Sequence, residues 1–330
     1  MFTATRPPSV PTSTCCSHEG SKLFIVFNVR SGRGRADAVR AAIAQACAEQ
    51  GRDYRMFEIT RPAKLTEQIR EAVAAARAES GLVVAAGGDG TINAVVQQVL
   101  GSGCALGVLP QGTFNYFGRT HAIPTDTAGA LAVLLRAPPV PVQVGLVNER
   151  VFLVNASLGL YARVLEDREV YKSRYGRSRW VALWAAFVTA MRRHPGWDLR
   201  IHVRGEERLV RTPTLFVGNN ALQLEQVGMP RPEAVEQGEL AAIALKPVGR
   251  LSMFRLMLHG AMARLGEADD VMHVSFRAMS VSPARPGRRR AKVATDGEVQ
   301  RMAMPLHFRV APEPLWLVKP RPGEEGDARR

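Results

Sequence analysis

The stretch LVVAAGGDGT, residues 82–91, decides the fold that we predict for this chain. Its first five residues form a continuous apolar run of the length typical of a buried strand. A glycine pair then interrupts the run, and from Thr91 to about residue 100 apolar residues recur at helical spacing. A strand that turns sharply into a helix is the repeating unit of a parallel sheet covered by helices. We therefore predict an α/β domain around this stretch.

The same alternation continues on both sides of it. Further strand-like runs and helical patterns precede and follow it, the strands at residues 22–29, 54–59 and 105–109 and the helices at residues 36–50 and 64–78. This order favours a parallel sheet with helices on both faces, and such sheets bind ligands at the carboxyl ends of their strands. The glycine-rich breaks at residues 87–90 and 110–112 both fall at such ends.

The pattern changes after Pro138. Residues 140–146 and 151–156 are typical of a hairpin around a turn at residues 148–149. Later strand-like segments are short and separated by turns, at residues 199–203, 214–217, 240–245, 271–276 and 291–295. Helical patterns at residues 175–193 and 251–264 interrupt them. We predict a second, mostly β domain.

Composition limits the class of protein. The chain has 330 residues, enough for two domains, with 46% hydrophobic and 22% charged residues, which is typical of a globular protein. No apolar run reaches the ~18 residues that a membrane-spanning helix needs. The four cysteines form neither a disulfide framework nor a metal-ligand spacing, which favours a reducing cytoplasm. A net charge of +14 predicts attraction to an anionic partner, either nucleic acid or acidic lipid.

The GGDGT segment, residues 87–91, carries the strongest chemical signal. Gly87, Gly88 and Gly90 allow backbone N–H groups to approach a phosphate closely, and the helix that we predict to start at Thr91 directs its positive end to the same place. Phosphate alone would repel Asp89, so this carboxylate suits a site where it positions Mg²⁺ or orients a hydroxyl. The alternative is a tight turn with an aspartate cap.

Two more loops follow predicted strands. In LPQGTFN, residues 109–115, Gly112 opens a turn in which Thr113 and Asn115 can contact phosphate or ribose. In NVRSGRG, residues 28–34, Asn28, Ser31 and Gly32 can contact outer phosphates, although a solvated basic turn is an equal alternative. Loops at the ends of successive strands predict one shared phosphate site.

Taken together, these segments resemble the catalytic domain shared by diacylglycerol, sphingosine and related lipid kinases. GGDGT is followed by Ile92 and Asn93, and LPQGTFN comes next in order. The loop after the first strand matches the Asn-Pro-x-Ser-Gly element of that family, with Val29 in place of proline. Downstream matches are FLVNASLGLY at 152–161, FVGNN at 216–220 and TDGE at 295–298, so the resemblance runs from about residue 22 to residue 320. GGDGT alone also suits NAD kinases.

The resemblance implies an architecture of the NAD kinase and diacylglycerol kinase type. It comprises an N-terminal Rossmann-like α/β domain with the GGDGT loop and a C-terminal β-sandwich domain. We accordingly predict a nucleotide-binding domain at 22–139, a lipid or substrate domain at 140–304 and a segment at 305–320 that returns to the first domain. Residues 1–21 are expected to be a disordered leader, and residues 321–330 a frayed tail.

The resemblance also implies roles in ATP- and Mg²⁺-dependent phosphorylation of a lipid alcohol. Glu298 would be the general base, while Asp89 and Asp296 would act in catalysis by positioning Mg²⁺ and the phosphates. Residues implied to bind the nucleotide are Asn28, Ser31, Gly32, Thr60, Gly87, Gly88, Asp89, Gly90, Thr91, Asn93, Gly112, Thr113 and Asn115. Without the resemblance, Asp296 and Gly297 would be interpreted as a hairpin turn.

The sequence departs from the family pattern at several positions. Gln143 and Tyr116 stand where the family usually has an acidic residue and an Asp or His, respectively. The loop EQGEL, residues 236–240, stands where a more acidic loop can hold a structural Mg²⁺. These changes put metal dependence and rate in doubt and leave the fold unaffected.

Basic segments suggest where the chain would meet a lipid. Residues 168–180 lead into an apolar stretch that ends near residue 191, as in an interfacial helix on anionic lipid, and residues 285–292 form a second basic cluster. Solvated arginine faces are an equal alternative for both. Neither cluster has the stacking platform of a nucleic-acid site, so we expect no nucleic-acid partner. We expect a cytoplasmic protein in transient contact with the inner membrane surface. Whether it forms a homodimer is left open by the sequence.

Two rival functions stay open beside the lipid kinase. The first is a kinase with a soluble substrate, such as an NAD kinase, against which LPQGTFN and TDGE count. The second is a catalytically degenerate module that binds nucleotide or lipid, which Gln143 and Gln237 favour. The acceptor itself is open among diacylglycerol, a sphingoid base, an undecaprenyl-type alcohol and a glycolipid.

Overall fold

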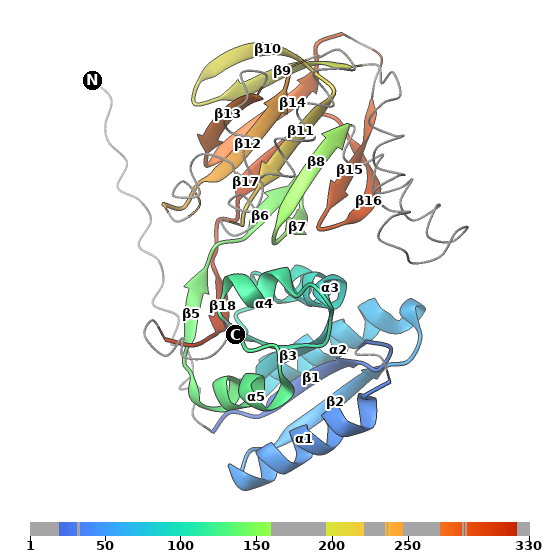
Figure 1. Cartoon of the computed structure of the whole chain (residues 1–330), viewed down its shortest axis with the longest axis vertical. Coiled ribbons are helices and arrows are strands. Elements are labelled where there is room, and N and C mark those ends of the chain that lie inside the picture. The colour runs from blue at the N-terminus through green and yellow to red at the C-terminus, as the bar shows by residue number, and fades with distance from the viewer. Residues whose placement is uncertain are drawn as a thin grey trace.

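The computed structural model of the chain describes residues 20–31, 34–159, 196–220, 235, 237–246, 271–285, 287 and 289–321. Several predicted features lie outside these residues: Gly32, the basic segment 168–180, the helical stretches 175–193 and 251–264, and nearly all of the leader and the tail. The described residues form two lobes, joined by two crossings of the chain (Figure 1).

The first lobe is built on a six-stranded sheet with the order β2-β1-β3-β4-β18-β5. Its first four strands are parallel. Three of them, β1, β3 and β4, are almost wholly buried apolar runs, as expected between two helical layers, whereas β2 lies at the edge of the sheet and is partly exposed. These strands are β1 (Leu23–Asn28), β2 (Tyr54–Ile59), β3 (Leu82–Gly87) and β4 (Leu106–Pro110). Their carboxyl ends lie at one edge of the sheet, which faces the second lobe.

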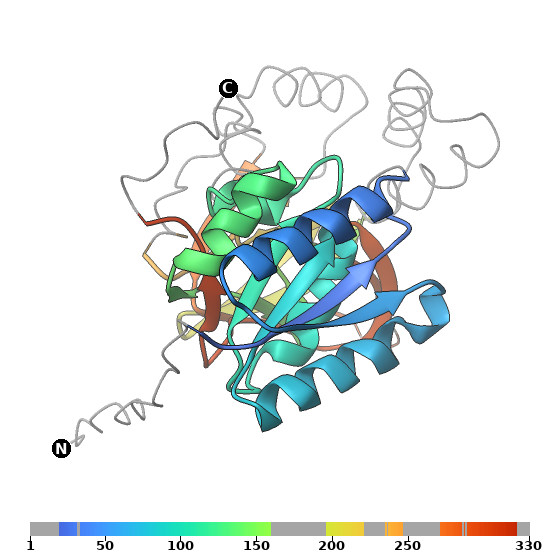
Figure 2. The ribbon, with the colours of Figure 1, turned by 90° about the horizontal axis from the view of Figure 1, so that it is seen from below.

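Helices cover both faces of this sheet, as Figure 2 shows from below. On one face lie α1 (Ala36–Glu49) and α5 (Thr127–Arg136), and on the other lie α2 (Leu65–Ala78) and α3 (Asp89–Val99). A 3₁₀ turn, η1 (Pro62–Lys64), precedes α2, and a short helix, α4 (Tyr116–Thr120), follows the second glycine loop. The sequence prediction omitted α5, although Asp126 caps it by accepting a hydrogen bond from Gly129 N at 2.7 Å.

The second lobe is a sandwich of two six-stranded sheets, as predicted. One has the order β10-β9-β14-β17-β6-β7 and the other β13-β12-β11-β8-β15-β16. The strands of the first are β6 (Gly145–Val147), β7 (Arg150–Phe152), β9 (Trp197–Val203), β10 (Glu206–Thr212), β14 (Ala278–Pro283) and β17 (Leu306–Val310). Those of the second are β8 (Asn155–Gly159), β11 (Thr214–Gly218), β12 (Leu240–Leu245), β13 (Val271–Phe276), β15 (Arg290–Thr295) and β16 (Glu298–Ala303).

The alternating pattern of these strands places one continuous core between the two sheets. Leu199, Val281 and Phe308 of one sheet pack in the same cluster as Leu158 and Val217 of the other. This is the arrangement expected of antiparallel sheets with one buried face each.

The junction between the lobes corrects one prediction. Residues 140–146 do not form a single strand of the second lobe, because β5 (Pro139–Val142) pairs with β18 (Leu315–Val318) at the edge of the first sheet. An edge strand tolerates Pro139 and Pro141, which lack a backbone donor. The chain therefore enters the second lobe after Val142 and returns between β17 and β18.

Candidate active site

Two glycine loops touch at the carboxyl edge of the first sheet. Gly87 lies opposite Pro110 in the parallel register, and Gln111 N donates to Gly87 O over 2.8 Å. A Cβ added to Gly112 would lie 3.0 Å from the Cα of Gly88. The absence of side chains at these positions thus lets the backbones of GGDGT and LPQGTFN approach each other closely.

The loop after β1 joins this pair through a side chain. Asn28 Nδ2 donates to Thr91 Oγ1 over 2.9 Å, and Thr91 is buried. A Cβ on Gly87 would lie 2.6 Å from the Cβ of Thr91, so Gly87 has to be glycine for Thr91 to take this position. Asn28 and Thr91 therefore hold the phosphate-loop candidate in shape.

Asp89 is the first residue of α3, two residues before the helix start that we predicted from the sequence. Its half-buried carboxylate faces the start of α4, where Phe117 N donates to Oδ1 over a long 3.5 Å. Burial raises the pKa of Asp89, and the backbone N–H groups of Phe117, Asn115 and Tyr116 oppose this rise. The carboxylate is thus weakly held at the meeting point of both loops.

Asn115 has a role other than the predicted one. It is buried with a left-handed backbone (φ +47°), its Oδ1 accepts from Gly112 N at 3.0 Å, and its Nδ2 donates to Gly112 O at 2.9 Å. Its amide therefore closes its own loop, which corrects the expectation that it offers its side chain to phosphate or ribose. Thr113 is exposed, and the ring of Tyr116 stacks on the exposed Phe114.

The remaining predicted contacts lie farther along the same edge. Thr60 is exposed directly after β2, which β1 separates from β3. Ser31 is half-buried and its N–H donates to Asn28 O over 3.0 Å. Both residues are at the correct end of the sheet for a nucleotide.

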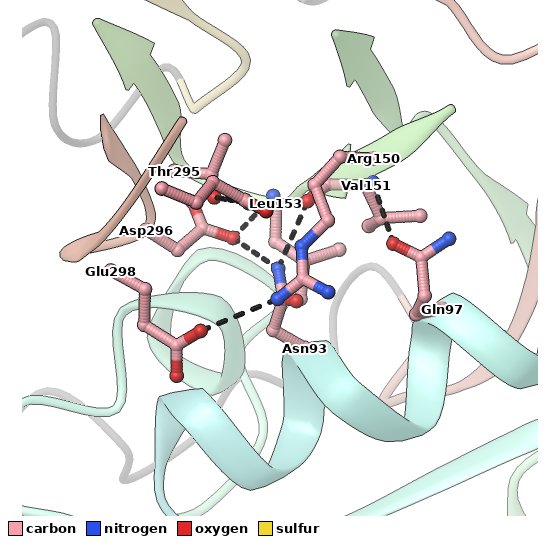
Figure 3. Close-up of polar contacts among 9 residues, drawn as sticks. Asn93, Gln97, Arg150, Val151, Leu153, Thr295, Asp296 and Glu298 are labelled. Carbon is pink, nitrogen blue, oxygen red and sulfur yellow. Dashed lines mark hydrogen bonds and ion pairs between the residues drawn. The ribbon is translucent and has the colours of Figure 1, made fainter. Parts of the chain in front are cut away.

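Asp296 lies in the two-residue turn between β15 and β16, where it and Gly297 both have positive φ. Its Oδ1 accepts from Val154 N at 2.8 Å and Asn155 N at 3.0 Å. Its Oδ2 accepts from Leu153 N at 2.7 Å and from Asn93 Nδ2 of α3 at 2.6 Å (Figure 3). Burial raises the pKa of Asp296, and these hydrogen bonds oppose the rise.

This environment corrects the metal role predicted for Asp296. A carboxylate has about four lone-pair positions, and four hydrogen bonds already use them. The segment is a hairpin turn, as it would be interpreted without the family resemblance. Its aspartate also has a specific role, because it ties the second lobe to α3.

One face of α3 holds the second lobe, a function that the sequence analysis missed. Asn93, predicted as a nucleotide contact, instead donates to Val151 O at 3.3 Å as well as to Asp296. Gln97, one helical turn later, accepts from Val151 N at 2.9 Å and donates to Glu149 O at 3.1 Å. Two amides at i and i+4 after GGDGT were the available signal.

Glu298 follows the same turn and projects toward the first lobe. Its Oε1 lies 3.6 Å from the position that a Cβ on Gly90 would occupy. Its Oε2 lies 3.3 Å from Nη2 of Arg150, and its side chain keeps 65% of its surface exposed. The structure therefore brings the predicted base to the predicted phosphate loop, from the opposite lobe.

The fit of a metal ion can be judged from these side chains. Within the described ranges no cluster of three or more His, Cys, Asp or Glu side chains could enclose a metal. Mg²⁺ in kinase sites needs only one or two carboxylates beside substrate phosphates. Asp89 fits that requirement and Asp296 does not.

The substituted position Gln143 lies in a separate polar contact. Its Nε2 donates to Asn219 Oδ1 at 2.8 Å and to Glu239 O at 3.2 Å. Glu239 of the EQGEL loop forms an ion pair with Arg204 at 3.0 Å, so the charge of this carboxylate is already balanced by an arginine. Gln143 thus braces the crossing between the lobes.

Comparisons with known proteins place the first lobe beside one family. The family model for the diacylglycerol kinase catalytic domain matches residues 22–147, which cover the first lobe apart from β18, together with the start of the second. The predicted resemblance to the diacylglycerol kinase catalytic family is confirmed. Diacylglycerol kinases of Staphylococcus epidermidis and Staphylococcus aureus are 38% identical over 103 residues, which are 31% of this chain and 33% of each relative. The chain thus matches about a third of the length of these relatives.

Solved structures extend the likeness to both lobes. A crystal structure from Bacillus anthracis str. Sterne superimposes with a TM-score of 0.70 at 17% identity, covering 96% of this chain and 99% of that one. A crystal structure of a diacylglycerol kinase from the same strain gives 0.64 at 17% identity, with 91% and 97% covered. These likenesses establish the two-lobed fold. Within the residues described for this chain, no helix is long and apolar enough to cross a membrane.

Proposed function

We propose that the protein is a kinase that transfers the γ-phosphoryl group of ATP to a hydroxyl group of a lipid. One observation carries the proposal. The glycine loops at the ends of β3 and β4 meet a carboxylate from the other lobe, because Glu298 Oε1 lies beside Gly90. A phosphate cradle facing a carboxylate is the combination that transfer to an alcohol needs.

The first lobe would bind the nucleotide. The backbone N–H groups at the start of α3 and the closely packed Gly88 and Gly112 offer donors without side-chain obstruction. Ser31, Thr60 and Thr113 follow β1, β2 and β4 at the same edge of the sheet. The polar groups of Asn93, Asn115 and Asp296 are already hydrogen-bonded within the protein. These residues would therefore hold the loops in place and would not contact the nucleotide.

The second lobe would supply the base. The hydroxyl oxygen of the lipid forms a bond to the γ-phosphorus while Glu298 accepts the hydroxyl proton. The bond from the γ-phosphorus to the β–γ bridging oxygen breaks, which releases ADP. Mg²⁺, when bound, neutralises charge on the phosphates, and Asp89 is the residue of this chain that would hold it.

The acceptor would reach the site at a membrane surface. The matched relatives are named diacylglycerol kinases, which makes diacylglycerol the first acceptor to test. Arg285 and Arg289, in the connection from β14 to β15, and Arg290, the first residue of β15, are exposed, and a basic surface there would favour anionic lipid. We propose transient contact with such a surface.

Label transfer from γ-labelled ATP tests the proposal. The acceptors would be diacylglycerol, a sphingoid base, a polyprenol and a glycolipid, each in anionic vesicles, with NAD as the soluble alternative. We expect a labelled lipid in the presence of Mg²⁺ and none after chelation. Labelled NAD would support the soluble-substrate kinase, and ATP binding without transfer to any acceptor would support the degenerate binding module.

A further inference from the structure

An arginine outside every quoted motif lies between two residues whose backbone bonds to α3 of the first lobe. Arg150 begins β7, directly after the turn at Asn148 and Glu149. Its Nη2 lies 3.3 Å from Oε2 of Glu298. Its Nε is shielded from solvent and has no hydrogen-bond partner in the described part of the chain. The guanidinium therefore interacts mainly with the carboxylate.

The backbone on both sides of Arg150 is fixed to α3. Gln97 Nε2 donates to Glu149 O, and the N–H and C=O of Val151 are bonded to Gln97 and Asn93, respectively. Since α3 starts in the GGDGT loop, the base of the arginine side chain is held at a defined place relative to that loop. Figure 3 shows Arg150 above α3, with its guanidinium joined to Glu298 by a dashed line.

Glu298 lacks comparable support of its own. Its side chain is 65% exposed and can adopt many rotamers in solvent. A base has to lie within hydrogen-bond reach of the proton that it accepts. If a partner holds Oε2 of Glu298, Oε1 stays beside Gly90. The phosphoryl group would lie on that side of the carboxylate.

We propose that Arg150 is a positioning residue that holds Glu298 beside Gly90 for phosphoryl transfer. The inference rests on the proposed function, since it assigns a partner to the proposed base. Arg150 acts through Glu298, so its removal lowers kcat and leaves nucleotide affinity nearly unchanged.

A double-mutant cycle on label transfer tests the inference. Arg150→Ala should lower kcat by about 10-fold or more, within the range that misplacing a base can cost. Glu298→Gln should lower it by at least about 100-fold, and the double variant should be no slower than Glu298→Gln alone. Arg150→Lys should recover part of the rate, because it keeps the charge and loses the planar donor geometry.

The control is Arg309→Ala. Arg309 is a neighbouring arginine of matched exposure, at 35% against 32%, and pairs with Glu149 at 2.8 Å. It should keep the wild-type kcat, and all variants should bind a non-hydrolysable ATP analogue within about 3-fold of the wild type. Equal thermal midpoints would exclude unfolding as the cause.

Each other outcome has a distinct meaning. An active wild type with an unchanged Arg150→Ala variant overturns this inference alone. A further loss of rate when Arg150→Ala is added to Glu298→Gln, or a more than 10-fold weaker analogue binding, overturns it in favour of direct phosphate contact. A wild type that labels no lipid overturns the proposed function and this inference with it.

Discussion

Two aspartates beside glycines, one from each lobe, have different environments. Asp89, the first residue of α3, receives one long hydrogen bond from Phe117 N at 3.5 Å, and the backbone N–H groups of Asn115 and Tyr116 also act on its carboxylate. Asp296, in the turn before β16, accepts four hydrogen bonds of 2.6 to 3.0 Å. Both were predicted to position Mg²⁺. The difference teaches that Asp89 is available for chemistry, whereas Asp296 joins the lobes.

We expect the largest effect from exchanging Asp89 for asparagine, and we expect it in the rate of label transfer. Asp89→Asn keeps the shape and removes the charge, so we expect label transfer to fall about 100-fold or more. The free energy of unfolding should stay equal or rise, because burial disfavours the carboxylate in the folded state. Transfer rates and urea unfolding of the same samples measure both quantities, and a loss of stability with normal transfer would contradict the assignment.

The matching exchange at Asp296 should act on stability instead. In Asp296→Asn an NH₂ group replaces one oxygen and faces backbone N–H donors, which leaves buried donors unpaired. We expect the free energy of unfolding to fall by about 2–3 kcal/mol. Urea unfolding measures this change. If the stability is unchanged while Mg²⁺ dependence is lost, the metal role returns to Asp296.

The first-lobe partner of Asp296 should show a smaller loss. Asn93 is buried and donates to Asp296 Oδ2 and Val151 O. Asn93→Ala should lower the free energy of unfolding by about 1–2 kcal/mol, and less so in the Asp296→Asn background because the contact is shared. Additive losses in the double variant would show that the two residues act independently.

The smallest effect is a dependence on pH. The fold raises the pKa of Asp89 above its usual value of 3.8, so the folded state holds that proton more tightly than the unfolded state. This contribution to stability is fully present below the unfolded pKa and is lost as pH rises through the folded pKa. The stability of the wild type relative to Asp89→Asn should therefore decline as pH rises above the usual pKa of 3.8. Unfolding at a series of pH values measures it, and a flat or rising difference would contradict the burial of this carboxylate.

Much of the fold could be predicted because its signals are local. The buried strands of the first sheet are continuous apolar runs, and β12 and β13 lie at the predicted residues. The helix after GGDGT begins at Asp89, two residues before the predicted start at Thr91, because Asp89 and Gly90 are residues typical of loops. The cap at Asp126 was an available signal for α5 that the prediction did not use.

The site was predictable where a loop works alone and not where distant segments meet. GGDGT and LPQGTFN indicate a phosphate cradle from their own glycines. Asn93 and Asp296 are 203 positions apart, and no spacing in the sequence shows that they bond. Arg150 was missed for the same reason, since only the hairpin of β6 and β7 brings it to Glu298.

The rate of label transfer from γ-labelled ATP to anionic vesicles containing diacylglycerol tests the central claim most directly. It would be measured for the wild type, Glu298→Gln and Glu206→Gln, whose side chain is 64% exposed and pairs with Arg208 at 2.7 Å away from the site. We predict transfer by the wild type and Glu206→Gln and a loss of at least about 100-fold in Glu298→Gln. Equal transfer by Glu298→Gln and the wild type would contradict the account of two lobes that bring a base to a phosphate loop.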